Sequence, residues 1–181
     1  MTLSLFQAQF ERALNAFLAQ KEKELTLTQD PFLQEILTYP QKLLMGGKRI
    51  RPYMAALMFR ACGGSMNAGV SRFLISLELF HLFGLIHDDI IDHGTSRHQI
   101  PTLHLHVANR LKAQKRRGDH THIGEAQALL VGDLLFSWSL ELLSQGTTFT
   151  PERQRAARAV FFRMSEEVMF GQMLDVDLTT R

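Results

Sequence analysis

Apolar residues recur along this chain at the spacing of α-helices. The clearest case is near the N-terminus, where apolar side chains follow one another at intervals of three or four: Phe6, Phe10, Leu14 and Phe17. Such intervals place side chains on one face of a helix. No segment alternates apolar and polar residues over the length of a strand. The pattern therefore predicts an all-α fold.

Start and stop signals divide the chain into helices. Asp30-Pro31 is typical of a helix start, and Pro40 is expected to end that helix. Gly46-Gly47 and Gly146 are expected breaks. The remaining signals predict helices over 52–62, 71–92, 124–145 and 151–174, with Ser71 as the cap of the second. The basic run over 110–117 is expected to be a solvated loop.

Composition excludes several classes of protein. The 181 residues are 45% hydrophobic and carry a net charge of +2, which fits one folded domain and argues against a dedicated nucleic-acid binder. One cysteine cannot form an intramolecular disulfide, so we expect a reducing, cytoplasmic setting. No run of consecutive apolar residues reaches about 18, and no transmembrane segment is expected.

Three carboxylates lie at the end of the apolar helix over 71–92, in the sequence His-Asp-Asp-Ile-Ile-Asp. Asp88 and Asp92 are four residues apart and share a helix face. Asp89 lies between them. Carboxylates gathered at the end of an apolar helix repel one another, and a divalent cation would relieve that repulsion. Mg²⁺ binds one or two carboxylates together with phosphate oxygens, so the cluster predicts a phosphorylated substrate; a solvated acidic helix end is the alternative.

Cations gather in two other places. Lys48, Arg49 and Arg51 follow two glycines at a predicted helix start, where backbone and side chains together could bind an anion. Arg97 follows the aspartates by five residues. A cation cluster separate from the carboxylates indicates two anionic ligands, although a basic solvated loop would give the same residues.

Five segments, taken in order, resemble the trans-type polyprenyl diphosphate synthases of the polyprenyl synthetase family. The segments are GGKRIRP, LELFHLFGLIHDDIID, the Arg-x-x-x-Pro-Thr stretch over 97–102, GEAQALLVGD and GQMLD. The resemblance implies an isoprenoid-synthase helical bundle that joins isopentenyl diphosphate to an allylic diphosphate with Mg²⁺. It also implies a homodimer.

The resemblance carries roles onto matching positions. It implies that Asp88 and Asp92 bind Mg²⁺ with Asp89 in support, and that Arg97 binds the allylic diphosphate. The isopentenyl diphosphate site would comprise Lys48, Arg51 and His81. Gln172 and Asp175 would line the metal side of the cavity.

Two departures from the family pattern bear on activity. His98 stands where the family usually has a second arginine, so we expect weaker, pH-dependent binding of isopentenyl diphosphate. The family's second aspartate-rich motif has no counterpart here. We therefore expect residues 1–181 to be the N-terminal part of one polyprenyl synthetase domain, without its C-terminal helices and inactive alone.

Product length in this family depends on residues that precede the first aspartates on the same helix. Phe83 would form the floor of the product cavity, with Phe80 one turn deeper, and this arrangement favours a C20 product; ordinary core packing is the alternative. Two other functions stay open. A class I terpene cyclase would not need Lys48, Arg51 and His81, whereas a non-catalytic partner subunit of a synthase would explain the missing motif.

Overall fold

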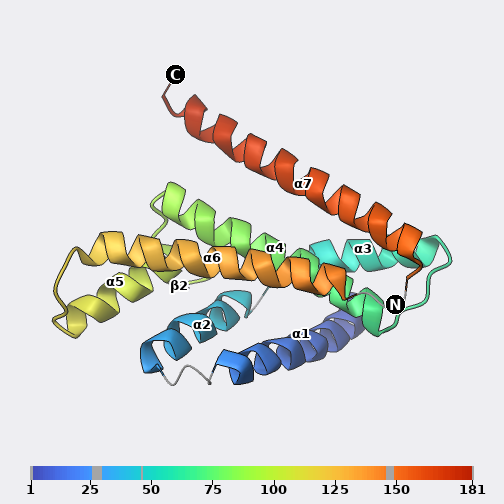
Figure 1. The fold of residues 1–181 in the computed structure, drawn as a ribbon, viewed down its shortest axis with the longest axis horizontal. Coiled ribbons are helices and arrows are strands. Elements are labelled where there is room, and N and C mark those ends of the chain that lie inside the picture. The colour runs from blue at the N-terminus through green and yellow to red at the C-terminus, as the bar shows by residue number, and fades with distance from the viewer. Residues whose placement is uncertain (1, 26–29, 46, 146–148, 181) are drawn as a thin grey trace.

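Seven helices carry most of the computed structural model, which describes residues 2–25, 30–45, 47–145 and 149–180. The predicted all-α fold is thereby confirmed (Figure 1). The helices are α1 (Leu3–Leu25), α2 (Pro31–Leu44), α3 (Ile50–Ala61), α4 (Ala68–Ile91), α5 (Leu103–Ala113), α6 (His120–Ser144) and α7 (Pro151–Leu178). A two-stranded hairpin, β1 (Ser96–Arg97) and β2 (Ile100–Pro101), follows α4. Gly46 and Gly146 lie outside the described residues.

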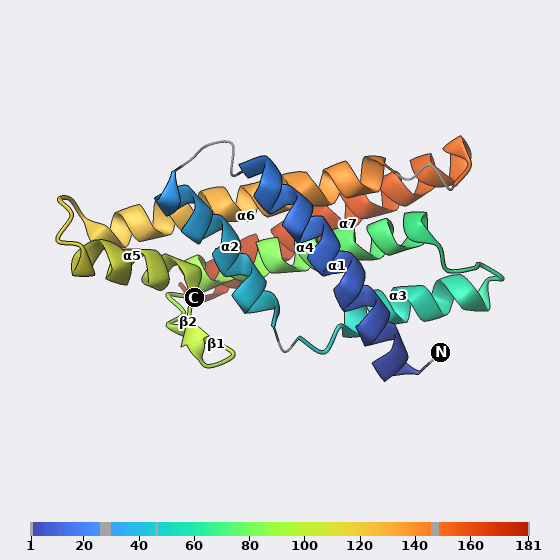
Figure 2. The same cartoon turned by 90° about the horizontal axis from the view of Figure 1, so that it is seen from below.

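Helices α4 and α6 form the centre of the bundle and run side by side (Figures 1 and 2). Both are apolar over most of their length, so each can be covered by neighbours on several sides. Helix α5 packs closely on the first half of α6, and Gly124 makes this approach possible. A Cβ atom at Gly124 would lie 2.4 Å from the carbonyl oxygen of His104.

Polar caps begin the two central helices earlier than the sequence predicts. Asn67, not Ser71, caps α4, because its side chain accepts a 3.0 Å hydrogen bond from the Val70 amide. Asp119 caps α6 in the same way, five residues before Gly124, where the prediction begins this helix. Both corrections add about one helical turn: Ala68–Val70 at the start of α4, and His120–Ile123 at the start of α6.

The prediction that Pro40 ends its helix is wrong, because α2 continues to Leu44. Proline removes one backbone hydrogen bond within a helix and tends to kink it. Here Pro40 is buried together with Tyr39, Leu43 and Leu44, and this packing offsets the loss.

Helix α5 was not predicted, and it changes the interpretation of the basic run. One face of the helix is buried through Leu103, Val107 and Leu111, which are spaced four residues apart. Two histidines, His104 and His106, lie between the first two of these positions. Arg110 belongs to its last turn and forms a 2.9 Å ion pair with Glu35. The basic run is thus part helix and part loop, and its first arginine stabilises the contact with α2.

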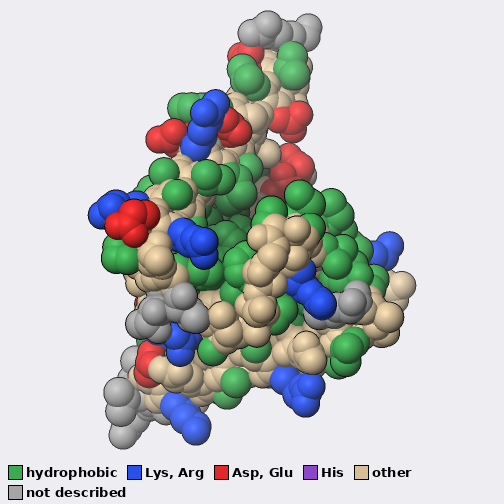
Figure 3. Space-filling view, turned by 90° about the vertical axis from the view of Figure 1, so that its right-hand side faces the viewer, with side chains coloured by type: hydrophobic (Ala, Val, Ile, Leu, Met, Phe, Trp, Pro, Cys, Tyr) green, Lys and Arg blue, Asp and Glu red, His purple; other side chains and the backbone are tan. Residues whose placement is uncertain are grey.

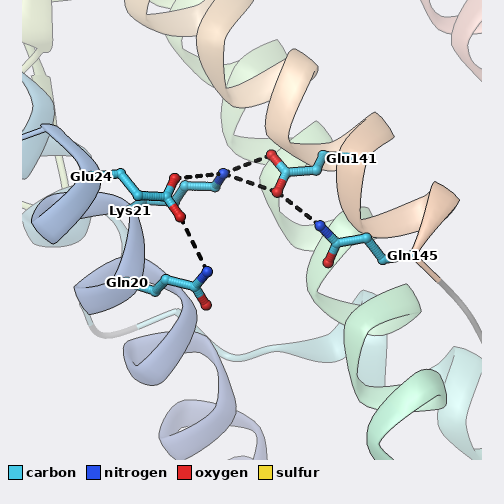
Figure 4. A network of polar contacts seen from close by, with 5 residues as sticks. All are labelled: Gln20, Lys21, Glu24, Glu141 and Gln145. Atoms are coloured by element: carbon cyan, nitrogen blue, oxygen red, sulfur yellow. Dashed lines mark hydrogen bonds and ion pairs between the residues drawn. The ribbon is translucent and has the colours of Figure 1, made fainter.

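Helix α1 crosses the bundle and is held to α6 by a polar network (Figure 4). The ammonium of Lys21 lies 2.7 Å from Glu141 and 3.1 Å from Glu24. Gln20 and Gln145 donate hydrogen bonds to the two carboxylates. Lys21 is 8% exposed, so its charge requires these partners.

Helix α7 leaves the body of the molecule towards its C-terminal end (Figures 1 and 3). Its buried residues are Phe161 and Ser165, near the middle of the helix. Many apolar side chains further along are exposed: Val168, Phe170, Met173, Leu174 and Leu178 among them. An apolar face of this size is typical of a surface that other helices cover.

Helices α4 and α6 are also long and apolar enough to cross a membrane, by length and composition alone. The criterion of about 18 consecutive apolar residues, used on the sequence, did not identify these two helices. In α4, 61% of the most apolar window is buried inside the protein, and in α6, 44%. Core helices of soluble proteins pass the same test, so this is weak evidence for a membrane.

Candidate functional site

The three carboxylates at the end of α4 divide between two environments. Asp89 is 5% exposed and faces Arg97, which donates to it from Nε at 3.0 Å and from Nη2 at 2.7 Å. Asp88 is half-buried and lies 3.7 Å from Arg97 Nη2, and Asp92, the C-terminal cap of α4, is exposed. The predicted cluster therefore consists of one close two-point pair at Asp89 and two carboxylates, Asp88 and Asp92, that are more accessible.

The hairpin that follows α4 places Arg97. His98 and Gln99, the two residues of its turn, have φ angles of 51° and 66°. Positive φ angles at both turn residues are typical of the turns that join strands in two-residue hairpins. The Tyr39 hydroxyl donates to the carbonyl oxygen of Pro101 at 2.7 Å, and the Thr102 hydroxyl donates to that of Gly94 at 2.8 Å. These bonds hold the arginine over the end of α4.

Electrostatics at Asp88 favour the binding of positive charge. Burial raises the pKa of the Asp88 carboxyl above its usual range, and the nearby Asp92 charge raises it further. No group of three or more acidic, histidine or cysteine side chains in the described part of the chain is arranged to hold a metal alone. Two carboxylates nevertheless fit Mg²⁺, which completes its coordination with water and substrate phosphates.

A groove of about 410 Å³ runs from Asp88 between α4 and α7. Apart from Asp88, His87 and Gln172, its walls are apolar or glycine: Phe83, Gly84, Ile91, Val168, Met169, Met173 and Val176. Gln172 lies beside Asp88 and favours its ionised form, although its buried Nε2 has no partner in hydrogen-bonding geometry. Asp175 is exposed and lies outside this lining. The groove suits an apolar chain with a charged group at one end.

Aromatic rings close the inner end of the groove. Phe83 is 8% exposed, and its ring centroid lies 5.1 Å from that of Phe136. Phe80 packs behind it, with its centroid 5.6 Å from Phe83 and 5.3 Å from Phe161. A Cβ atom at Gly84 would meet nothing within 4 Å, so the groove widens beside Phe83.

A second cavity of about 360 Å³ lies on the other side of α4. It brings together all of the predicted cations: Lys48, Arg49, Arg51, His81, Arg97 and His98. Arg51 Nη1 lies 3.1 Å from His81 Nε2. Burial lowers the pKa of His81 to about 4, with further lowering by Arg51, Arg97 and Arg49. The positive charges that line this cavity suit an anion. Arg97 lies between the cavity and the carboxylates.

Arg49 differs from its two cationic neighbours. It is 4% exposed and forms 2.6 Å ion pairs with Glu11 and Glu78. The sequence predicted that three cations could bind an anion. The ion pairs of Arg49 reduce that number to two, Lys48 and Arg51. Sequence reasoning also missed Glu78; an isolated carboxylate within the apolar stretch of α4 was the signal of a buried partner.

The segment GEAQALLVGD contributes packing next to the groove. A Cβ atom at Gly132 would lie 2.4 Å from the imidazole of His87, so glycine leaves room for that ring. His87 Nε2 lies 3.2 Å from the carbonyl oxygen of Leu129 and 3.5 Å from a carboxylate oxygen of Asp133. These contacts fix the side chain that precedes Asp88.

A larger cavity, of about 510 Å³, lies near the opposite end of α4, between α3 and the start of α7. Its lining is mostly apolar and contains no carboxylate, so it lacks the chemistry of the other two. The candidate site is therefore the carboxylate groove together with the cationic cavity.

Comparisons with known proteins agree with this geometry. The polyprenyl synthetase family model matches residues 30–181. A geranylgeranyl diphosphate synthase of Methanosarcina mazei is 35% identical over 136 residues, which cover 75% of this chain and 36% of that protein. A geranylfarnesyl diphosphate synthase of the same organism is 31% identical and covers 87% of this chain and 44% of the relative.

The solved structure of a geranylgeranyl pyrophosphate synthase from Corynebacterium glutamicum, complexed with isoprenyl diphosphate and magnesium, is 30% identical and has a TM-score of 0.89. The match covers 99% of this chain and 52% of that one. The chain thus spans less than half the length of the relatives above and about half of this solved protein. With a family match over most of its residues, the chain belongs to the polyprenyl synthetase family.

Proposed function

We propose that this chain supplies both diphosphate sites of a prenyl diphosphate synthase. The reaction would join isopentenyl diphosphate to an allylic diphosphate and give an all-trans product, with C20 favoured. The observation that carries the proposal is the pair of sites on opposite sides of α4, with Arg97 between them. The names of the relatives support the same reaction class.

Asp88 and Asp92 would hold magnesium, the metal in the Corynebacterium complex. When bound, magnesium supplies positive charge that stabilises the departing diphosphate. Arg97 uses Nε and Nη2 for Asp89, so among the described contacts Nη1 remains for a phosphate oxygen. The apolar groove walls would exclude water from the allylic cation left behind.

The cationic cavity would bind the second substrate. Lys48, Arg51 and neutral His81 would hold the diphosphate of isopentenyl diphosphate, and His98 would contact it from the hairpin. The double bond of this substrate would then attack the allylic cation and form the new carbon–carbon bond. Loss of a proton to the released diphosphate would complete the reaction. Binding both substrates side by side makes the reaction effectively unimolecular and so lowers the entropic part of its barrier.

The cationic cavity disfavours a terpene cyclase, which binds a single diphosphate and needs no second anion site. Two available carboxylates disfavour a non-catalytic partner subunit. We also propose a homodimer located in the cytoplasm. Exposed apolar side chains on α6 and α7, such as Leu130 and Phe170, support association with further protein surface.

The direct test is an assay of the protein encoded by the complete reading frame. Radiolabelled isopentenyl diphosphate and a C5, C10 or C15 allylic diphosphate would be supplied with Mg²⁺. We expect longer prenyl diphosphates, mainly C20. Hydrocarbon from the allylic diphosphate alone would support the cyclase instead. Turnover only after mixing with a second synthase would support the partner subunit.

A further inference from the structure

Arg49 lines the cationic cavity and connects three helices there. Its Nε donates to Glu11 of α1 at 2.6 Å, and its Nη1 donates to Glu78 of α4 at 2.6 Å. Its Nη2 donates to the carbonyl oxygen of Leu44, the last residue of α2, at 2.6 Å. The buried guanidinium is thus bonded through all three of its nitrogens, and burying it would otherwise be costly.

The backbone around Arg49 is shaped for this arrangement. Arg49 itself has a φ of 54°, a left-handed conformation that a non-glycine residue adopts at a cost. A Cβ atom at Gly47 would lie 2.6 Å from Nη1 of Arg49, so this glycine leaves space for the guanidinium. Gln7 donates a 2.9 Å hydrogen bond to the Lys48 carbonyl oxygen, which adds a second link from α1.

The buried Arg49–Glu78 ion pair lines the cavity together with the residues proposed to bind the anion. Arg49 stands between Lys48 and Arg51, and its partner Glu78 precedes His81 by three residues on α4, about one turn. The Arg49–Glu78 bond therefore joins the two segments that supply Lys48, Arg51 and His81. Because Lys48 and Arg51 have long side chains with many rotamers, their convergence depends on a fixed backbone.

We propose that Arg49, through Glu78 and Glu11, is a positioning residue that holds Lys48 and Arg51 against His81 for the diphosphate of isopentenyl diphosphate. The inference rests on the proposed function, since it assigns that substrate to the cavity. Arg49 does not need to touch the substrate. Its effect passes through the position of the Lys48–Arg51 turn.

Two variants separate position from charge. Glu78→Gln keeps the size of the side chain and removes the charge that pairs with Arg49. Gly47→Ala removes no charge but displaces the Arg49 guanidinium. In the protein from the complete reading frame, we expect each to raise KM for isopentenyl diphosphate by about tenfold, since a misplacement of about 1 Å can cost up to about 100-fold. KM for the allylic diphosphate should stay within about twofold.

The matched control is Glu141→Gln, which makes the same carboxylate-to-amide change in the Lys21 network (Figure 4). It should lower the melting temperature without changing either KM. If Glu78→Gln and Gly47→Ala also leave both KM values unchanged while the proteins remain folded, the positioning role is wrong. A parallel rise in both KM values would equally refute it, because a general loosening of the fold would then explain the effect.

Calorimetry with inorganic pyrophosphate in EDTA tests the same role without turnover. Without metal, binding should depend on the cationic cavity, and both variants should weaken it by about tenfold. If the wild-type protein catalyses no condensation yet binds pyrophosphate in this way, the proposed function fails and the positioning of the anion site stands. If the variants bind as tightly as wild type, the positioning role fails, whatever the reaction.

Discussion

Arg97 and Asp89 form a two-point ion pair across the junction of α4 and the hairpin, with Nε–Oδ2 and Nη2–Oδ1 distances of 3.0 and 2.7 Å. Parallel bonds of this kind fix the plane of a guanidinium as well as its position. The carboxylate is 5% exposed and the arginine is half-buried, so solvent screens the pair only in part. One of the three aspartates thus serves to orient the arginine between the two sites.

Replacement of this carboxylate should affect one substrate more than the other. We expect Asp89→Asn to raise KM for the allylic diphosphate by about tenfold, because Arg97 loses its fixed orientation. The free energy of unfolding should fall by about 2 kcal/mol, the usual value of a charged hydrogen bond. Steady-state kinetics with each substrate varied in turn, together with urea unfolding, would measure both. Lost stability with an unchanged KM would leave Asp89 with a structural role alone.

Asp88 should contribute to turnover at the expense of stability. Burial and the Asp92 charge raise the pKa of Asp88, so its ionised form is disfavoured in the folded protein. Asp88→Asn should therefore unfold at higher urea concentration than wild type in EDTA. The same change should lower turnover by about 100-fold or more, since the metal and the charge it supplies are lost. Near-normal turnover by the variant would contradict the metal role.

Added Mg²⁺ provides the control for that prediction. An ion that binds only the folded protein raises the free energy of unfolding. Wild type should gain melting temperature on addition of Mg²⁺ and pyrophosphate, and Asp88→Asn should gain much less. An equal gain in both proteins would place the metal elsewhere.

His81 should make the protein less stable in mild acid. Burial and the neighbouring arginines lower its pKa from 6.5 to about 4 in the folded protein. The unfolded chain therefore binds the proton more readily, and stability is lost as the pH falls from about 6.5 to about 4. The shift corresponds to at most about 3 kcal/mol. Urea unfolding at several pH values should show this loss in wild type and a smaller loss in His81→Gln; parallel curves would show that His81 is not the cause.

Local spacing was sufficient to locate part of the site. Asp88 and Asp92 lie four residues apart on one helix, so their proximity follows from helix geometry alone. The groove depends on a longer-range contact, because Gln172 reaches Asp88 from α7. The convergence of Lys48 and Arg51 on His81 likewise spans about 30 residues, and it was expected only from the family resemblance.

Arg49 shows what the sequence could not indicate. Lys48, Arg49 and Arg51 look alike as a basic cluster, yet only a left-handed backbone and two distant carboxylates decide which of them is buried. Helix α5 was missed for a related reason. Its apolar positions Leu103, Val107 and Leu111 are few, and their burial comes from the close approach of α6 at Gly124.

Phe83 should limit product length because its ring closes the inner end of the groove against Phe136. Phe83→Ala would open space towards Phe80, and we expect products longer than those of wild type. Thin-layer chromatography of the dephosphorylated products would show the change. Phe17→Ala removes a comparable ring, which packs on Trp138 away from the groove, and should lower stability while leaving product length unchanged. If both variants give wild-type products, Phe83 is an ordinary core residue and the limit to chain growth lies elsewhere.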